Sequence, residues 1–368
     1  MSRSSNQSPH PAEAHPIKIV INRYGPPSVL EVTKDTPKQP GPADVRIRVR
    51  AAGVGFSDIM AQHGGYPLAP SRPFTPGYDL AGVVEECGSH VTDLSVGQNV
   101  VALNPGMSCY AESVTMNASY VVPTPDDLDP AIAVALVLNY LTAHAILHRV
   151  AQVKPGQSIL IHSAAGGVGT ALVQLSRIAG LKIYGTASPS KHELLRTYGV
   201  TPIDYRSEDF LQRIHQETGA GVDVAVDPFG GSHLLRSYRS VKSGGRVVAY
   251  AFSSSKYGGI VPMILGVMET AILTILPFGK RVRLCALPKT VKTDTPWYQT
   301  TMNELLNLYR DGKISPVIYA RVPLREAHRA HELVESGSVS GKVILVTDKE
   351  SGRDSLAELH EEAPPNAS

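Results

Sequence analysis

The sequence predicts an α/β protein in which a β barrel accompanies a doubly wound parallel sheet. Its 368 residues are enough for two domains with sizeable cores. Short apolar strands separated by Pro and Gly turns follow one another over residues 17–122, which is typical of a small barrel. Beyond residues 154–156 (Lys-Pro-Gly), strands alternate with helices, and this order produces a parallel sheet covered on both faces.

The first part of the chain is predicted to consist mainly of strands. Apolar runs bounded by turn signals place them at residues 17–22, 30–34, 45–52, 80–87, 97–102, 111–116 and 120–122. Ala131, Ala135, Leu138 and Ile146 recur at helical spacing, so we expect a helix over residues 129–151.

The second part alternates regularly between the two kinds of element. Predicted strands cover residues 158–162, 182–186, 202–205, 222–226, 246–251 and 283–287. Predicted helices cover residues 170–180, 191–198, 209–218 and 233–240. The remaining elements, at 298–310, 317–322, 326–335 and 342–346, are expected to rejoin the barrel.

A turn of small residues follows the first strand of the second part. It matches the pattern G-x-G-x-x-G in part, because Ala164 stands where the first glycine belongs while Gly166 and Gly169 fit. Between a buried strand and a helix, such a turn lets the backbone approach a pyrophosphate, and the free N–H groups of the helix point at it. We therefore predict that Gly166, Gly167, Val168 and Gly169 bind a dinucleotide. The alternative is a turn rich in glycine for packing alone.

The end of the next strand indicates which dinucleotide. An NAD site carries Asp or Glu there for the ribose 2′-hydroxyl. This chain has Ser188, Ser190 and Lys191 instead, which are donors suited to a 2′-phosphate. The sequence thus favours NADPH, although Lys191 also fits an exposed lysine at a helix start.

Composition narrows the classes of function. A formal net charge of +2 gives no electrostatic attraction to nucleic acid or to an anionic membrane. The three cysteines, Cys87, Cys109 and Cys285, are isolated, which suits a reducing compartment. Residues 1–15 have no apolar secretion signal, and like residues 349–368 they lack a core-forming pattern. We expect a cytoplasmic protein with two disordered tails.

Taken together, several motifs resemble the medium-chain dehydrogenases/reductases of the zinc-independent quinone oxidoreductase type, the branch that includes the vesicle amine transport protein homologues. The resemblance extends over about residues 17–348. Its motifs are AAGVGFSD at 51–58, TPGYDLAGVV at 75–84, NYLTA at 139–143, the turn 164–169, GTASPSK at 185–191, PIDY at 202–205, residues 222–231 and GKV at 341–343.

The resemblance implies a GroES-like substrate domain over residues 16–142 and 296–348. It implies a Rossmann domain over residues 143–295 that binds NADPH, with the active-site cleft between the two domains. It also implies a homodimer, joined by pairing of the last Rossmann strand near residues 283–287.

Further cofactor contacts follow from the same resemblance. They fall on Thr142 and Phe252 at the nicotinamide end, on Ser188, Lys191 and Tyr205 around the 2′-phosphate and adenosine, and on Lys342 at the cofactor phosphates.

Zinc-dependent relatives in this family carry Cys-His and His-Glu ligand pairs. This chain has Gly55-Phe56 and Tyr78-Asp79 at those positions, and only Cys109 where four closely spaced cysteines would be needed. His144 and His148 share a helix face but lack a further ligand, so they are interpreted as packed or solvated side chains. We expect no metal.

Without a metal, hydride delivery to a conjugated acceptor is the favoured chemistry, because hydrogen-bond donors can stabilise the delocalised charge. Tyr66, Tyr140 and Ser57 are the candidate catalytic donors, although each tyrosine fits a core aromatic equally well. Many family members carry Asn where this chain has Gly55, which widens the expected pocket.

The segment 260–278 is strongly apolar, but prolines and Glu269 interrupt it, so we do not expect a stable membrane span. A helix lining the cleft or the dimer interface is favoured, and in the cleft it would suit an apolar conjugated substrate. The function predicted is reduction of quinones or of activated C=C bonds of α,β-unsaturated carbonyls by NADPH. The alternatives are an enoyl reductase for a biosynthetic intermediate and an NADPH-binding scaffold or membrane-associated protein with little turnover.

Overall fold

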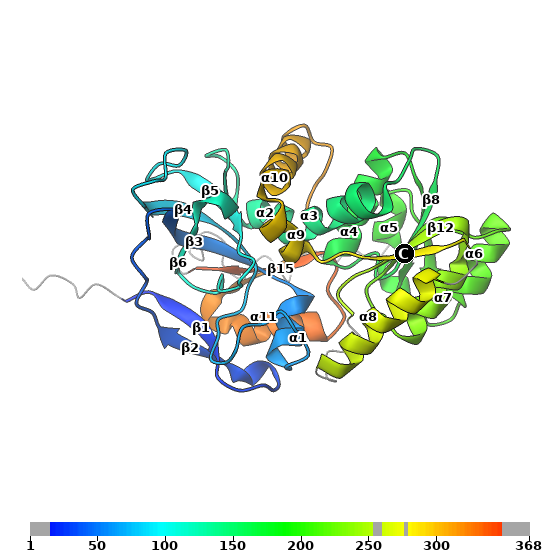
Figure 1. Cartoon of the computed structure of the whole chain (residues 1–368), viewed down its shortest axis with the longest axis horizontal. Helices are drawn as coiled ribbons and strands as arrows, with labels where there is room; N and C mark the ends of the chain where they lie inside the picture. Colours follow the sequence, from blue (N-terminus) through cyan, green and yellow to red (C-terminus); the bar gives the residue numbers. More distant parts are fainter. Residues whose placement is uncertain (1–14, 253–259, 276–278, 348–368) are drawn as a thin grey trace, which may run out of the picture.

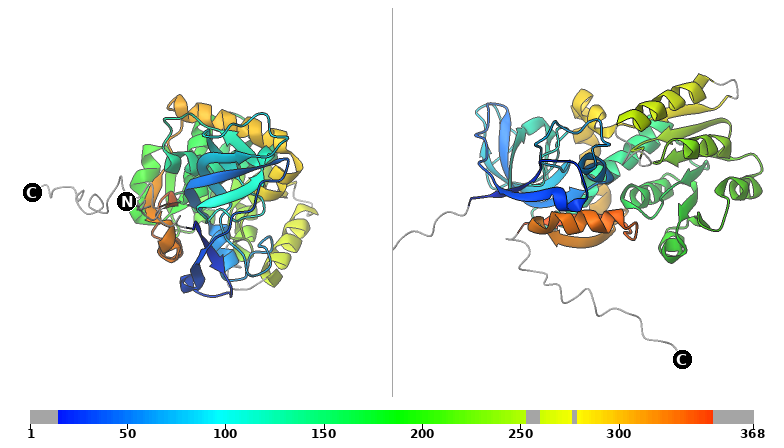
Figure 2. Two further views of the ribbon diagram at one scale, coloured as in Figure 1. Left: turned by 90° about the vertical axis from the view of Figure 1, so that its left-hand side faces the viewer. Right: turned by 90° about the horizontal axis from the view of Figure 1, so that it is seen from below.

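The computed structural model describes residues 15–252, 260–275 and 279–347. The predicted tails therefore lie almost wholly outside the described residues. Two sheets occupy opposite ends of an elongated molecule, with the barrel on the left of Figure 1 and the parallel sheet on the right. The view from below separates the blue barrel strands from the green helices of the other end in the same way (Figure 2). The predicted fold class is confirmed.

The barrel is a seven-stranded sheet in the order β14-β15-β3-β4-β5-β7, with β6 paired to β3. All pairs are antiparallel except β14–β15, so the last strand of the chain lies beside a strand from the first part. A separate hairpin, β1–β2, covers one end. The strands are β1 (Ile17–Ile21), β2 (Leu30–Lys34), β3 (Asp44–Val54), β4 (Asp79–Cys87), β5 (Asn99–Leu103), β6 (Ser113–Asn117), β7 (Val121–Pro123), β14 (Ile318–Pro323) and β15 (Lys342–Val346).

One continuous helix connects the two ends. It comprises α2 (Pro130–Ala135) and α3 (Leu141–His144) with wider π-type turns at Leu136–Tyr140 and Ala145–Ala151. The Asp129 carboxylate caps it by accepting from the amides of Ala131 and Ile132. The predicted domain boundary at 142/143 falls inside this helix. It is long and apolar enough to cross a membrane, yet 78% of its apolar 18-residue stretch is buried within the fold, as in a core helix.

The second sheet is parallel, in the order β10-β9-β8-β11-β12-β13. The strand order reverses between β8 and β11, and ligands of such sheets bind at the carboxyl ends of the strands around this point. The strands are β8 (Ser158–Ile161), β9 (Lys182–Ala187), β10 (Thr201–Asp204), β11 (Val222–Asp227), β12 (Val241–Ala249) and β13 (Arg281–Leu284). The helices are α4 (Gly167–Ile178), α5 (His192–Thr197), α6 (Phe210–Thr218), α7 (Ser232–Ser240) and α8 (Ile260–Ile275).

Three helices complete the described chain: α9 (Leu287–Thr293), α10 (Thr295–Arg310) and α11 (Ala327–Glu335). The structure corrects the last predicted strand, since β13 ends at Leu284 and α9 begins at Leu287. A short helix, α1 (Phe56–Gln62), was not predicted. It starts where the Asp58 carboxylate accepts from the Gly55 amide, a local cap that hydrophobic periodicity does not reveal.

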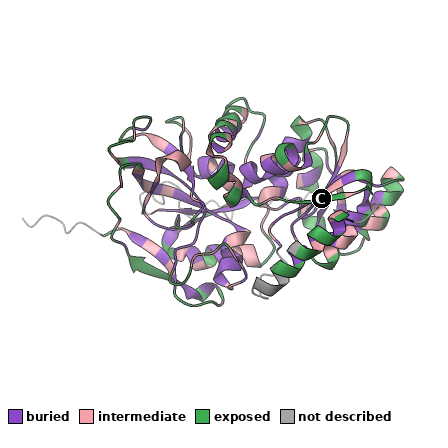
Figure 3. Cartoon of the chain, in the orientation of Figure 1, coloured by how far each residue is buried: buried purple, intermediate pink, exposed green. Residues whose placement is uncertain are grey.

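The apolar segment after residue 260 forms α8, whose Gly266, Thr270 and Leu273 are buried. The opposite face is exposed, as Figure 3 shows in green. It carries Ile264, Leu265, Met268, Ile272 and Ile275, which are 46 to 81% exposed. Residues 276–278 of the predicted segment lie outside the described residues.

Candidate cofactor and substrate site

The turn before α4 leaves backbone donors free. Gly166 is the N-cap of α4 and supplies no side-chain cap, so the first amides of the helix have no partner within it. Gly169 packs against the turn so closely that a Cβ there would lie 2.2 Å from the Ser163 carbonyl oxygen. These free amides and the missing side chains fit a bound phosphate group.

The same turn is where the two domains meet. The Gly341 amide donates to the Ala165 carbonyl at 2.9 Å, and Gly341 and Gly166 form an isolated parallel bridge. A Cβ on Gly167 would lie 2.5 Å from Nδ2 of Asn139, on the long connecting helix. Asn139 was not among the predicted site residues, because only the fold brings it to the turn.

The residues predicted to surround the 2′-phosphate and adenosine follow the ends of two neighbouring strands, β9 and β10. Ser188 directly follows β9 and is nearly buried, with its hydroxyl 3.3 Å from that of Ser190. Tyr205 follows β10 and is 55% exposed. Burial, followed by the charge of Arg206, lowers the pKa of Lys191. Arg206 was missed by the sequence reasoning, and a nearby anion would relieve its repulsion with Lys191.

Lys191 has a structural partner that was not predicted. Its ammonium donates to the carbonyls of Gly337 and Val339, at 2.8 and 2.7 Å, in the loop before β15. Two of its three donors are therefore used in tying the parallel-sheet domain to the barrel domain. The third remains for an anion.

Thr142 lies on the connecting helix, nearly buried. Its hydroxyl donates to the Leu138 carbonyl at 2.6 Å. The oxygen keeps acceptor capacity, so this side chain can still receive a hydrogen bond from a bound group.

Lys342, predicted to reach the cofactor phosphates, has a buried partner in the structure. Its ammonium is 2% exposed and forms an ion pair with the Asp79 carboxylate inside the barrel. Asp79 also accepts from the Leu138 amide at 3.2 Å. Lys342 thus neutralises a buried carboxylate rather than reaching toward the cofactor phosphates, because only an opposite charge makes such burial tolerable.

This ion pair also bears on zinc. At the ligand positions of the zinc enzymes, Gly55 has no side chain and Asp79 is paired with an ammonium. Tyr78 donates its hydroxyl proton to Tyr66 at 3.0 Å. These residues do not fit a tetrahedral zinc site.

Tyr66 is well placed to act as a donor. Burial raises its pKa to about 12, so the phenol keeps its proton. Because Tyr78 donates to the Tyr66 oxygen, the Tyr66 hydrogen is free to point elsewhere. Ser57, in the first turn of α1, is half-buried.

Both side chains belong to segments that adjoin the cofactor turn. A Cβ on Gly55 would lie 3.2 Å from the Ser57 hydroxyl and 3.1 Å from the Leu138 side chain. Leu138 precedes Asn139, the neighbour of Gly167, and its amide is held by Asp79 next to Tyr78. The sequence could not reveal this convergence, since residues 55–79 lie far along the chain from Leu138, Asn139 and Gly167.

Two other predicted site residues lie in the core. Tyr140 is 2% exposed, and its hydroxyl donates to Gln174, whose side chain also holds Ser315 at both backbone groups. The Tyr140 hydroxyl is therefore already used within the core. Phe252 is 9% exposed and packs its ring against Gly230 and Gly266, as part of the core beneath α8.

A buried carboxyl lies under this site. Asp58 accepts from the amides of Gly55 and Gly77 and from the Tyr110 hydroxyl. Burial nevertheless raises its pKa to about 7. Tyr110 also contacts Nε2 of His331 at 3.2 Å, so a polar network extends from α1 to α11.

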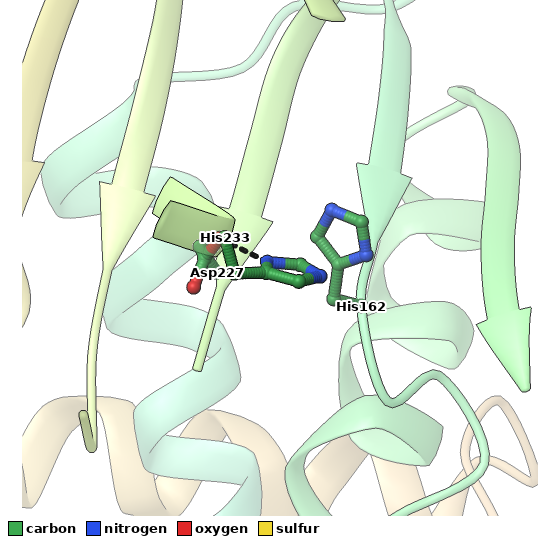
Figure 4. Close-up of side chains that lie close together, drawn as sticks. All are labelled: His162, Asp227 and His233. Carbon is green, nitrogen blue, oxygen red and sulfur yellow. Dashed lines mark hydrogen bonds and ion pairs between the residues drawn. The ribbon is translucent and has the colours of Figure 1, made fainter. Parts of the chain in front are cut away.

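A second polar cluster lies at the carboxyl ends of β8 and β11 and comprises His162, Asp227 and His233 (Figure 4). Burial and the neighbouring His233 lower the pKa of His162 to about 3. Burial of Asp227 opposes ionisation, but hydrogen bonds from His233 and Ser237 and the nearby imidazoles lower its pKa to about 2. The sequence reasoning missed this cluster, because its members lie far apart along the chain.

Family models match both domains. The model described as alcohol dehydrogenase GroES-like domain covers residues 41–126, and the model described as zinc-binding dehydrogenase covers residues 199–345.

Whole-chain comparisons agree with this. The rat synaptic vesicle membrane protein VAT-1 homolog is 35% identical over 329 residues, which are 87% of this chain and 81% of that protein. A Pseudomonas aeruginosa quinone oxidoreductase is 32% identical over 89% of this chain and 99% of its own length. The crystal structure of Escherichia coli quinone oxidoreductase complexed with NADPH has a TM-score of 0.81 at 28% identity, covering 90% of this chain and 99% of that one.

Proposed function

The chain belongs to the quinone oxidoreductase type of medium-chain dehydrogenases/reductases, and we propose that it uses NADPH to reduce quinones or the activated C=C bond of α,β-unsaturated carbonyls. The observation that carries the proposal is the uncapped amino end of α4 beside Asn139 and Gly341, where the two domains meet.

The preference for NADPH over NADH rests on the strand ends. Ser188, Lys191 and Arg206 offer a hydroxyl and two cations where the ribose 2′ position is expected, and residues 188–192, directly after β9, include no carboxylate. The bound cofactor supplies a hydride, and the protein supplies position and charge stabilisation.

Tyr66 is the proposed hydrogen-bond donor to the substrate. Reduction places negative charge on the carbonyl oxygen of the acceptor, and a phenol proton aimed at that oxygen stabilises it. The hydrogen bond from Tyr78 polarises Tyr66 and so strengthens it as a donor.

Cofactor titration tests the proposal. We expect wild-type protein to bind NADPH more tightly than NADH, as followed by cofactor fluorescence. Lys191→Ala and Arg206→Ala should each weaken NADPH binding about tenfold to hundredfold and leave NADH binding nearly unchanged, since a charged hydrogen bond to phosphate contributes about 1.5–3 kcal/mol. Equal binding of both cofactors by the wild type would refute the phosphate assignment.

Turnover distinguishes the enzyme from the scaffold alternative. An enzyme should consume NADPH with a panel of quinones and enones, whereas a scaffold should bind NADPH without consuming it. Turnover only with carrier-bound enoyl substrates would favour the biosynthetic enoyl reductase.

We also propose that the protein acts in the cytoplasm as a homodimer. Among the described residues, no strand covers the outer edge of β13, and the exposed apolar face of α8 lies beside it. A second copy would cover both. The free thiols Cys87, Cys109 and Cys285 suit a reducing compartment.

A further inference from the structure

The cluster at the ends of β8 and β11 brings together side chains from three segments. Val226 pairs with Ile161, so the next residues of the two parallel strands, Asp227 and His162, are neighbours at the same edge. The His162 amide donates to the Val226 carbonyl at 3.2 Å, which holds that register. His233 comes from the first turn of α7 and meets them from the side (Figure 4).

The polar atoms of the cluster face one another. Oδ2 of Asp227 lies 2.7 Å from Nδ1 of His233 and 2.6 Å from the Ser237 hydroxyl. That hydroxyl lies 3.1 Å from Nε2 of His162. One ligand atom from each of the two histidines and the aspartate can be chosen so that all three lie within 4.8 Å of one another.

The outward-facing atoms of His162 and Asp227 already have hydrogen-bond partners. Thr186 contacts Nδ1 of His162 at 3.1 Å, and the amides of Phe229 and Gly230 donate to Oδ1 of Asp227 at 2.8 and 2.9 Å. Such outer hydrogen bonds orient metal ligands and keep their remaining atoms directed inward.

Aromatic rings shield the cluster on two sides. The Phe210 ring lies 4.6 Å from the His162 ring, and the Phe229 ring lies 4.6 Å from the His233 ring, measured between centroids. Asp227 and His162 are buried, while the His233 side chain is 28% exposed and leaves a route from solvent. A dry site with one exposed ligand can exchange an ion with solvent.

We propose that His162, Asp227 and His233 form a binding site for a divalent transition-metal ion, with zinc as the reference ion. Two imidazoles and one carboxylate are a ligand set that zinc and its neighbours prefer. Zinc bonds of about 2.0–2.2 Å place tetrahedral ligands roughly 3.4 Å apart. The widest pair must therefore close by up to about 1.4 Å, and rotation of the partly exposed His233 can provide this.

Zinc binding replaces the contact between Oδ2 of Asp227 and Nδ1 of His233, and a His233 that binds through Nδ1 carries its proton on Nε2. The Ser237 hydroxyl turns from Asp227 toward another acceptor, or supplies the fourth ligand. The site is proposed separately from the NADPH reaction, although both lie at the carboxyl ends of β8 and β11, and it is distinct from the positions that hold zinc in the zinc-dependent relatives.

Calorimetric titration of chelator-treated full-length protein with zinc chloride tests this site. We expect one ion per chain in the wild type at this site and at least tenfold weaker binding in His233→Gln, whose fold is checked by its thermal melt without zinc. His148→Gln is the control. This exposed histidine lies next to His144 on the connecting helix, away from the cluster, so its loss should leave zinc affinity unchanged.

Anomalous scattering from zinc-soaked crystals provides a measurement without any variant. Density for zinc between His162 and His233 is expected. No binding at millimolar zinc, unchanged affinity in His233→Gln, loss of binding in His148→Gln, or zinc located only elsewhere would each overturn the proposal.

Discussion

Lys342 and Asp79 stand 263 positions apart in the chain and form an ion pair inside the barrel, with their side chains 2% and 0% exposed. Asp79 begins β4 and Lys342 begins β15, and β3 lies between the two strands. A Cβ on the intervening Gly53 would overlap both side chains, so the glycine makes room for the pair. The pair thus joins the first and last parts of the barrel.

Lys342→Met should destabilise the protein by about 3–5 kcal/mol, because it leaves the Asp79 charge buried without a partner. Thermal unfolding should show a clearly lowered Tm. The double variant Asp79→Leu with Lys342→Met should recover much of that loss, since it removes both charges. NADPH affinity of the folded single variant should stay close to that of the wild type. A large fall in affinity at unchanged Tm would instead restore the cofactor role of Lys342.

Tyr66→Phe should lower kcat with a quinone or enone about a hundredfold to a thousandfold, the usual effect of removing one donor to a developing oxyanion. KM for NADPH should stay unchanged. Tyr140→Phe is the matched control, because its hydroxyl is bound to Gln174 in the core. If Tyr140→Phe loses more activity than Tyr66→Phe, the assignment of the donor is wrong.

His331 makes the stability depend on pH. Burial, followed by the nearby His63, lowers the pKa of His331 to about 3, whereas a histidine in the unfolded chain has the ordinary pKa of 6.5. The unfolded state therefore binds more protons between these values, and the stability contributed by neutral His331 is full above pH 6.5 and declines as the pH falls toward 3.

His331→Gln should therefore flatten the pH dependence by up to about 1.4 kcal/mol for each pH unit in this window. The measurement is the Tm of both proteins at several values between neutral and acidic pH. His215→Gln, which changes an exposed histidine, should behave as the wild type does. Equal slopes for all three proteins would show that His331 does not carry the effect.

Charges on the exposed surface formed by α8 and β13 should prevent dimer formation. Met268 is 54% and Leu284 39% exposed, and an aspartate at either position would be buried without a partner in a dimer that covers this surface. Light scattering should report a dimer for the wild type and a monomer for Met268→Asp and Leu284→Asp. Leu68→Asp, on an exposed loop of the barrel domain, is the control. A wild-type monomer would contradict the proposal directly.

The order of elements followed from the sequence to a large extent. Periodicity located β2 and β15 at their observed bounds and placed the barrel before the parallel sheet. It was less successful where a local cap or a turn decides the structure. Thus α1 depends on Asp58 accepting from Gly55, and the strand expected at 283–287 ends early at Leu284.

The candidate site divides in the same way. The turn at Gly166 and Gly169 could be predicted to start a helix, because a short motif specifies the local conformation of consecutive backbone groups. The contacts of Tyr140 and Lys342 could not be predicted, because a tyrosine or lysine in a motif does not reveal what its distal atoms meet. Gln174 and Asp79, the partners that decide their roles, come from other elements.

By itself, the sequence determined the fold class, the glycine-rich turn before α4 and the family, since each depends on patterns within a few tens of residues. Only the tertiary structure decided which polar side chains have hydrogen-bond or ion-pair partners in the interior. It also decided which side chains converge on a common point, as His162, Asp227 and His233 do. The physical reason is that hydrogen bonds and ion pairs act over a few ångströms in space, and residues far apart in the chain come within that range only when the strands pair.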